Sequence, residues 1–98
     1  MPELYVVVRT RGPGWNVALP LEQQEDWRGH ADFMNGLHAS GFVVLGGPLE
    51  GTPDVLLIVR ANDAQEIQER LAPDSWTTKN LLRVKQILPW QLRLGSLP

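Results

Sequence analysis

The chain has 98 residues, of which 43% are hydrophobic and 20% charged, and it contains no cysteine. This length predicts one domain over residues 1–98, and the missing cysteine excludes disulfides, thiolate metal sites and a cysteine nucleophile. The net charge of −2 argues against nucleic-acid binding. No apolar run reaches the ~20 residues that span a bilayer, and no signal segment opens the chain. We therefore expect a cytoplasmic protein that binds neither nucleic acid nor membrane.

The first apolar segment, residues 4–10, is short and rich in β-branched residues. This pattern predicts a strand that is buried on both faces, or nearly so. Glycine and proline in residues 11–14 then end the strand. The stretch 15–21 has no clear period and contains a further proline, so we expect a loop there, a candidate lid or pocket wall.

A helix is predicted from Glu22 onward. One face follows the 3–4–3–4 spacing of Trp27, His30, Met34, Leu37 and Gly41. Acidic residues at positions 22, 25 and 26 are expected in the first turns, where the helix dipole favours negative charge. Gly41 stands where a C-terminal cap is expected.

Two further strands are predicted over residues 42–45 and 54–60. The first ends in Gly46-Gly47-Pro48, and the turn between the two strands is rich in glycine and proline. Together they predict an antiparallel hairpin. The Gly46-Gly47-Pro48 segment either lets a ligand approach the backbone closely or is simply the end of a strand entering a turn.

A second, short helix is predicted from position 64, with Asn62 or Asp63 as its N-cap, and Pro73 ends it. A last strand is expected over residues 81–94, with Pro89 marking a bulge, a bend or an edge. The resulting order βαββαβ is that of the ferredoxin-like α+β fold, a four-stranded antiparallel sheet with two helices on one face.

The strands are too apolar for a sheet whose second face meets water. A chain of this length has no third layer to cover that face. We therefore expect a homodimer with sheet packed against sheet. The alternative is that the strands of a small domain are hydrophobic without being covered.

His30 lies on the apolar stripe of the first helix, and Asp74 directly follows the second helix. In this topology the two can meet. A carboxylate that accepts from one ring nitrogen fixes the tautomer and leaves the other nitrogen as an acid or base. The alternatives are a hydrogen-bonded core histidine and an aspartate that only caps a turn. His38 lies further along the helix and is expected to be too far away for the same site and to face solvent. No metal site is expected, because the metal-ligand spacings are absent.

Four of the seven aromatic residues are tryptophan. Trp27, Trp76 and Trp90 are predicted near the crevice between helix and sheet, and Trp15 on the loop that would cover it. Large aromatic side chains are common both in small-molecule pockets and in dimer contacts. We name as pocket-lining residues Trp27, Met34, Gly46, Gly47, Pro48 and Trp76.

The segments HADFMNGLHASGFVVLGGPL (30–49), APDSW (72–76) and ILPWQ (87–91) resemble the YCII-related (YciI-like) domain proteins over residues 4–95. The resemblance implies a ferredoxin-like fold that forms a dimeric α+β barrel, similar to muconolactone isomerase. It also implies a His–Asp pair in the pocket, which these motifs place at His30 and Asp74. The chain departs from the family by Ser75, where proline is usual, and by its longer loop over 11–21. A dehydrochlorinase-type lyase activity is associated with a few members.

Two functions are compatible with these features. The first is a small enzyme of the lyase or isomerase type that needs no cofactor, with His30 as general acid/base oriented by Asp74, acting on a small organic molecule. The second is a non-catalytic protein that binds a small molecule in the same pocket.

Overall fold

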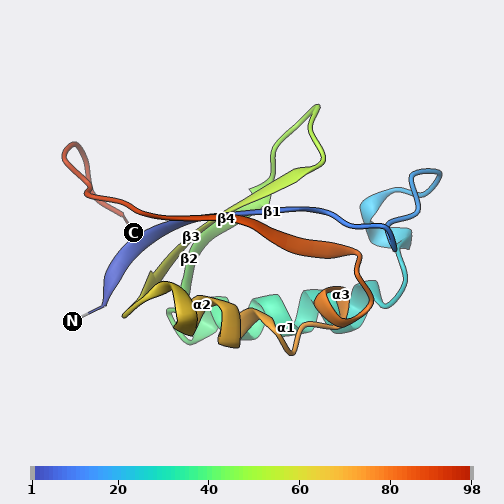
Figure 1. The fold of residues 1–98 in the computed structure, drawn as a ribbon, viewed down its shortest axis with the longest axis horizontal. Coiled ribbons are helices and arrows are strands. Elements are labelled where there is room, and N and C mark those ends of the chain that lie inside the picture. Colours follow the sequence, from blue (N-terminus) through green and yellow to red (C-terminus); the bar gives the residue numbers. More distant parts are fainter. Residues whose placement is uncertain (1, 98) are drawn as a thin grey trace.

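The computed structural model describes residues 2–97, which form an α+β fold of one sheet and one helical layer (Figure 1). The elements in chain order are β1 (Glu3–Arg11), the 3₁₀ turn η1 (Leu21–Gln23), α1 (Trp27–Ala39), β2 (Val43–Pro48), β3 (Asp54–Ala61), α2 (Ala64–Leu71), α3 (Ser75–Thr78) and β4 (Leu82–Pro89). The four strands pair antiparallel in the order β2-β3-β1-β4. The predicted ferredoxin-like βαββαβ architecture is confirmed.

The helices all lie on one face of the sheet (Figure 1). In β1 the side chains of Tyr5, Val7 and Arg9 are buried beneath this layer, whereas Val6 and Val8 on the opposite face are only half-buried. Burial therefore alternates along the strand, as it does when one sheet face is covered. The prediction that this strand is buried on both faces is wrong for the single chain.

The core has two parts that are separated along the sheet. The larger joins inward residues of the strands, such as Val7 and Val59, to Leu37 of α1 and to Ile67 of α2. The smaller surrounds the fully buried Trp76. It contains Leu81 and Leu82 beside the start of β4, Trp15 and Leu21 from the chain between β1 and α1, and Trp27 at the start of α1. The second cluster places three large aromatic side chains at one end of the helix–sheet interface.

The first helix begins later than predicted. Asp26 has a left-handed backbone conformation, with φ of 54°, so α1 starts at Trp27 and the preceding residues form η1 and a turn. The expected placement of acidic residues in the first helical turns is therefore wrong. At the other end Gly41 adopts φ of 85°, and its backbone N–H donates to the His38 carbonyl, which confirms the predicted cap.

The second half of the fold departs from the prediction at two points. Gly46, Gly47 and Pro48 are the end of β2, which pairs with β3 as far as Pro48, so this strand is longer than the predicted residues 42–45. Residues 75–78 form the short helix α3, which the sequence did not predict.

The last strand is shorter and bends elsewhere than expected. It ends at Pro89 instead of position 94, and it is an edge strand, as proline favours. The register against β1 shifts between Val8 and Arg9, where Gln86 and Val84 are the partners and Lys85 is extra. Because this bulge inserts one residue, Val84 and Ile87 both pack against the core, although simple alternation would separate them.

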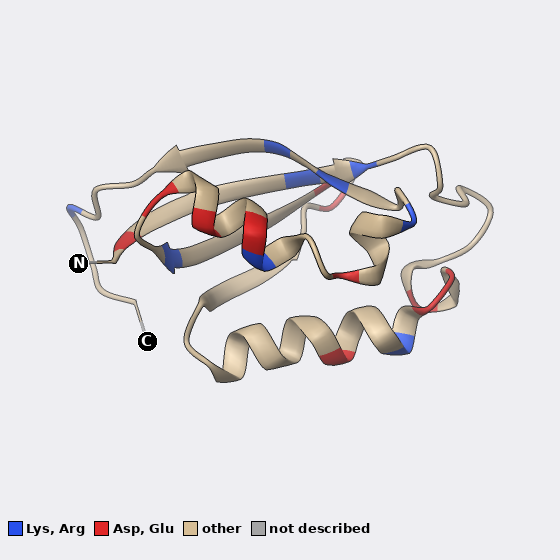
Figure 2. Cartoon of the chain, turned by 60° about the horizontal axis from the view of Figure 1, so that its bottom comes forward, with Lys and Arg blue, Asp and Glu red and all other residues tan. Residues whose placement is uncertain are grey.

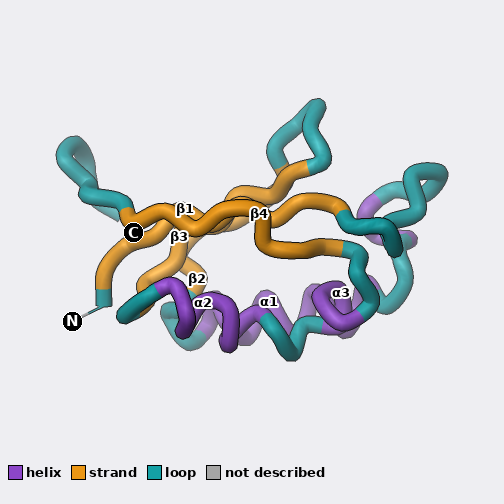
Figure 3. The backbone as a smooth tube through the Cα atoms, viewed as in Figure 1, coloured by secondary structure: helices purple, strands orange, loops and turns teal. Residues whose placement is uncertain are grey.

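The loop after β1 is fixed against the turn between α3 and β4, beside which it runs in Figure 3. The backbone N–H groups of Gly12 and Gly14 donate to the carbonyls of Leu81 and Asn80, each at 2.9 Å. A Cβ atom at either glycine would collide with a backbone carbonyl oxygen of this turn. Glycine at both positions therefore permits the close approach that brings the loop beside α3.

Basic and acidic residues are interspersed along the described elements (Figure 2). Within residues 2–97, no helix has both the length and the apolar character that a membrane span requires.

Candidate active site

A cavity of about 290 Å³ lies between α1 and the sheet. The six residues predicted to line a pocket all border it: Trp27, Met34, Gly46, Gly47, Pro48 and Trp76. Further apolar side chains complete the wall, namely Trp15, Leu21, Val43, Val55, Leu57 and Leu82. Its volume lies at the lower end of the roughly 300–1,000 Å³ that small-molecule pockets occupy. The cavity is therefore suited to a small, largely apolar molecule.

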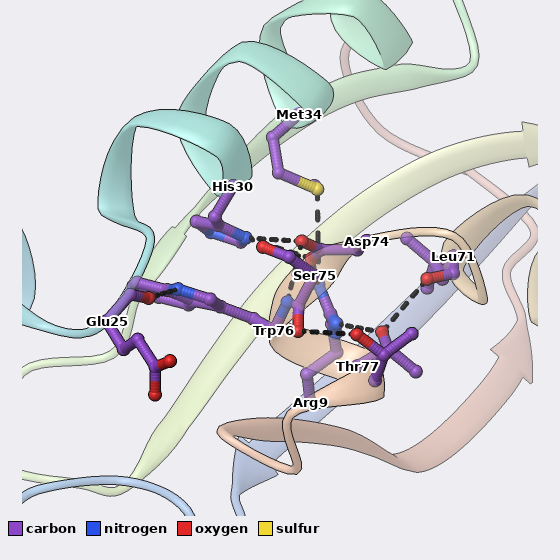
Figure 4. A network of polar contacts seen from close by, with 10 residues as sticks. Arg9, Glu25, His30, Met34, Leu71, Asp74, Ser75, Trp76 and Thr77 are labelled. Carbon is purple, nitrogen blue, oxygen red and sulfur yellow. Dashed lines mark hydrogen bonds and ion pairs between the residues drawn. The ribbon is translucent and has the colours of Figure 1, made fainter.

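His30 and Asp74 meet at this cavity, although 44 residues separate them in the sequence (Figure 4). Nδ1 of His30 lies 2.9 Å from Oδ2 and 3.0 Å from Oδ1 of Asp74. The histidine comes from the start of α1, and the aspartate is the N-cap of α3, where its Oδ1 accepts the backbone N–H of Trp76. The cap fixes the carboxylate with respect to α3, and the serine at position 75 is compatible with this cap.

Arg9 is a third member of this cluster, and the sequence reasoning missed it. Its guanidinium donates through Nη1 to Oδ2 of Asp74 at 3.0 Å and through Nη2 to Oγ1 of Thr77 at 2.8 Å. Arg9 is 1% exposed and Asp74 is fully buried. A buried pair of this kind is retained only where each charge has its partner. The strand register, and not the sequence, places Arg9 on the inward face of β1 with Tyr5 and Val7.

The His30 ring is also fixed by stacking. It lies parallel to the Trp76 ring, with 3.8 Å between centroids and 3° between planes. Trp76 is in turn anchored by its indole N–H, which donates to the Glu25 carbonyl at 2.6 Å. Trp27 packs against the same pair, with its ring centroid 5.8 Å from that of Trp76. The orientation of the imidazole is therefore set both in its plane, by Asp74, and across its plane, by Trp76.

The charge on Asp74 is maintained against burial. Burial raises the pKa of this carboxyl, but the hydrogen bond and charge of His30, the charge of Arg9 and the Trp76 N–H outweigh that effect. The pKa of Asp74 is therefore held below its ordinary value of 3.8. Because an ionised carboxylate only accepts hydrogen bonds, the proton between the two groups belongs to Nδ1 of His30.

With that proton on Nδ1, the neutral form of the ring carries its lone pair on Nε2. Nε2 makes no hydrogen bond within residues 2–97, and it is not fully buried. His30 lines the cavity, so Nε2 is the basic atom that a bound molecule can reach.

The loop between β1 and α1 forms a fixed wall of the cavity. Trp15 and Leu21 from this loop border the cavity. The loop is cross-linked by the buried side chain of Gln24, which accepts from the Asn16 N–H at 3.0 Å and donates to the carbonyls of Asn16 and Leu19 at 2.7 and 2.9 Å. These bonds hold Trp15 edge-on against Trp76, with 5.4 Å between their centroids.

Two positions differ from their expected places. His38 is exposed, as predicted, but it also borders the cavity together with Asn35, so the expectation that it lies too far along the helix is wrong. The reason is that residues 27, 30, 34 and 38 share one face of α1, which runs along the whole cavity. Trp90, predicted near the crevice, follows the end of β4 and does not line the cavity.

The glycines of β2 determine the shape of the opposite wall. Gly46 pairs with Leu57, and a Cβ atom at Gly46 would lie 2.6 Å from Cδ2 of that leucine. A Cβ atom at Gly47 would meet no atom within 4 Å. A side chain at position 46 would therefore have to displace the end of the Leu57 side chain, whereas one at position 47 would meet open space.

Within residues 2–97 no group of three or more histidine, aspartate or glutamate side chains is arranged to hold a metal ion. Comparison of the chain with models of known protein families and with curated proteins finds no match.

The cluster predicts a pH-dependent stability. Because the pKa of Asp74 is lowered by folding, its contribution is complete above about pH 4 and is lost as the pH falls through the folded value. At pH 7 we expect Asp74→Asn to lower the free energy of unfolding by about 3–5 kcal/mol, since it leaves the buried Arg9 charge uncompensated. Denaturant unfolding at pH 7 and at pH 3 should show this difference shrinking in acid.

The matched control is Asp32→Asn, which removes an exposed carboxylate 4.0 Å from Arg28. It should change the free energy of unfolding by less than about 1 kcal/mol at both pH values. A deficit for Asp74→Asn that is the same at pH 3 and pH 7 would contradict the assigned ion pair.

Proposed function

We propose that the protein is a small enzyme of the lyase or isomerase type that performs acid/base chemistry on a small organic molecule without a cofactor. His30 is the general acid/base, and Asp74 orients it. The proposal agrees with the resemblance to YCII-related domain proteins, whose His–Asp pair corresponds to the same two residues. The observation that carries it is the imidazole whose Nδ1 is held by a buried carboxylate and whose Nε2 faces a cavity.

The proton balance of such a reaction is simple. Nε2 takes a proton from a C–H or O–H group of the bound molecule, and the imidazolium keeps its Nδ1–H bond to Asp74. The electron pair left on the molecule either expels a leaving group, which gives an elimination, or is protonated at a different atom, which gives an isomerisation. Nε2 returns the proton to the leaving group or to that atom, so the histidine ends neutral.

The surroundings favour this chemistry. The walls around His30 are aromatic and aliphatic, including Trp27, Met34 and Trp76. In such an environment the attraction between the imidazolium and Asp74 is stronger than in water. Because the stacking and the hydrogen bond hold the ring before any ligand binds, little reorganisation is needed when the proton moves.

Replacement of His30 tests the proposal. Because a proton-abstracting enzyme exchanges substrate C–H for deuterium in D₂O, ¹H NMR of a mixture of small organic acids and ketones detects activity before the substrate is identified. We expect the wild type to erase at least one C–H signal and His30→Ala to slow this exchange by about 10²–10⁴-fold. The matched control is Asp32→Asn, at an exposed residue of the same helix that does not line the cavity, and it should exchange like the wild type.

Thermal unfolding of both variants completes the test. His30→Ala leaves the Arg9–Asp74 ion pair in place, so the fold should persist. Exchange by His30→Ala at the wild-type rate would overturn the catalytic assignment. Ligand binding by the wild type with neither deuterium exchange nor conversion of the bound molecule would instead identify a non-catalytic binding protein, the alternative function of this cavity.

We further propose that the protein is a homodimer that packs sheet against sheet. The face opposite the helices carries an aliphatic patch that follows from the strand register: Leu4, Val6, Val8, Leu45, Leu56, Ile58 and Leu88. Leu45 and Leu88 remain 46% and 45% exposed. Contiguous apolar patches of this kind are uncommon on the surface of a monomer. A second copy of the chain offers an identical apolar surface, which buries both patches together.

Leu88→Lys should weaken this dimer, because it places a charge within the aliphatic patch. Sedimentation velocity should then report a smaller mass than for the wild type at the same concentration. The matched control is Leu94→Lys, at a leucine that is 89% exposed and lies beyond the end of β4. It should leave the mass unchanged. A wild-type chain that sediments as a monomer at high concentration would contradict the proposal.

A further inference from the structure

The cavity contains a positive charge that the acid/base pair does not use. Arg11, the last residue of β1, lines the cavity and is exposed. Its guanidinium carbon lies 4.6 Å from the centroid of the Trp15 ring. Within residues 2–97, no carboxylate oxygen lies within 4.0 Å of this guanidinium.

The other charged groups at the cavity have partners. Arg9 is paired with Asp74, as described above. Asp54 also lines the cavity, and Nζ of Lys85 lies 3.0 Å from its Oδ2. Hydrogen bonds from Thr10 and Lys85 lower the pKa of Asp54, so it stays ionised and its negative charge is offset by Lys85. Among the described residues, Arg11 is therefore the charge in the cavity wall that is left without a counter-charge.

A continuous aromatic wall connects this charge to the catalytic histidine. Arg11 lies over Trp15, Trp15 packs edge-on against Trp76, and Trp76 stacks on His30. A guanidinium that stacks on an indole uses its face, so the N–H groups at its edge stay free. Those groups match the two oxygens of a carboxylate.

We propose that the cavity binds a planar organic anion, an aromatic or conjugated carboxylate, with its carboxylate at Arg11 and its unsaturated part against the tryptophans. The reacting C–H or O–H group then faces Nε2 of His30. Only this last placement rests on the proposed acid/base function, because recognition of the anion depends on Arg11 and the aromatic wall. An aromatic plane suits walls made of indole rings, whose faces and edges both attract π systems.

The experiment compares two probes of the same shape, 4-methylbenzoate and the neutral 4-methylbenzamide. Binding is followed through the four indole N–H signals in ¹⁵N–¹H NMR spectra. Trp15, Trp27 and Trp76 line the cavity, whereas Trp90 does not, so its signal serves as an internal control. We expect 4-methylbenzoate to shift the first three signals and to leave that of Trp90 in place.

The variants assign the charge. Arg11→Gln should weaken 4-methylbenzoate binding about fivefold, the effect of one exposed ion pair, and leave 4-methylbenzamide binding unchanged. The matched control is Arg83→Gln, at an exposed arginine of β4 that does not line the cavity. It should bind both probes like the wild type.

The outcomes separate the two proposals. Three results would each overturn the inference: equal affinity for the acid and the amide, no binding of either, or an Arg11→Gln variant that binds the acid like the wild type. None of them would affect the test of His30 by deuterium exchange. Binding that depends on Arg11, combined with no deuterium exchange by the wild type, would uphold the anion site and refute the acid/base function.

Discussion

The buried ion pair between Arg9 and Asp74 is the interaction on which the candidate site depends. Both side chains are removed from water, so each needs the other, and together they connect β1 of the sheet to α3 of the helical layer. The carboxylate has capacity for further hydrogen bonds, and it uses them on the Trp76 N–H and on Nδ1 of His30. One charge pair thus fixes a helix cap and a histidine tautomer at the same time.

The rest of the site is arranged around this pair. Thr77 accepts the second Arg9 bond and donates from the same hydroxyl to the Leu71 carbonyl, which ties α3 to the end of α2. Trp76 follows Asp74 in α3 and stacks on the His30 ring. The loop after β1 contributes Trp15, which reaches α3 because two glycines allow close backbone contact. Helix, loop and strand therefore converge on one imidazole, and its free nitrogen faces an apolar cavity.

The order of the strands and of the two longer helices could be predicted from the sequence, because the helical period and the turn residues are local signals. The predicted topology then allowed His30 and Asp74 to meet, and the family resemblance implied that they form a pair. The place of Arg9 in the site could not be predicted. The run Val6-Val7-Val8 is apolar at every position, so it hides which face of β1 is inward and leaves the side of Arg9 undetermined. The predicted start of α1 is too early because the acidic residues before Trp27 are typical of a first helical turn. Asp26 instead adopts a left-handed conformation, and the helix begins after it.

The tertiary packing determined the remaining differences. The helix α3 has only four residues, which are too few to show a helical period in the sequence. It forms because Asp74 caps it and the Trp76 side chain is buried. The bulge at Lys85 depends on how β4 pairs with β1, which is a long-range choice. His38 borders the cavity because the cavity extends along most of α1. The length of the cavity could not be predicted from the sequence.

The protonation pattern of the His30 ring tests the role of the cluster most directly, and long-range ¹⁵N–¹H correlation NMR at neutral pH measures it. We expect a proton on Nδ1, held by Asp74, and a lone pair on Nε2. We also expect Asp74→Asn to remove this preference. A wild-type ring with its proton on Nε2 would contradict the acid/base assignment, because the atom that faces the cavity would then be unable to accept a proton.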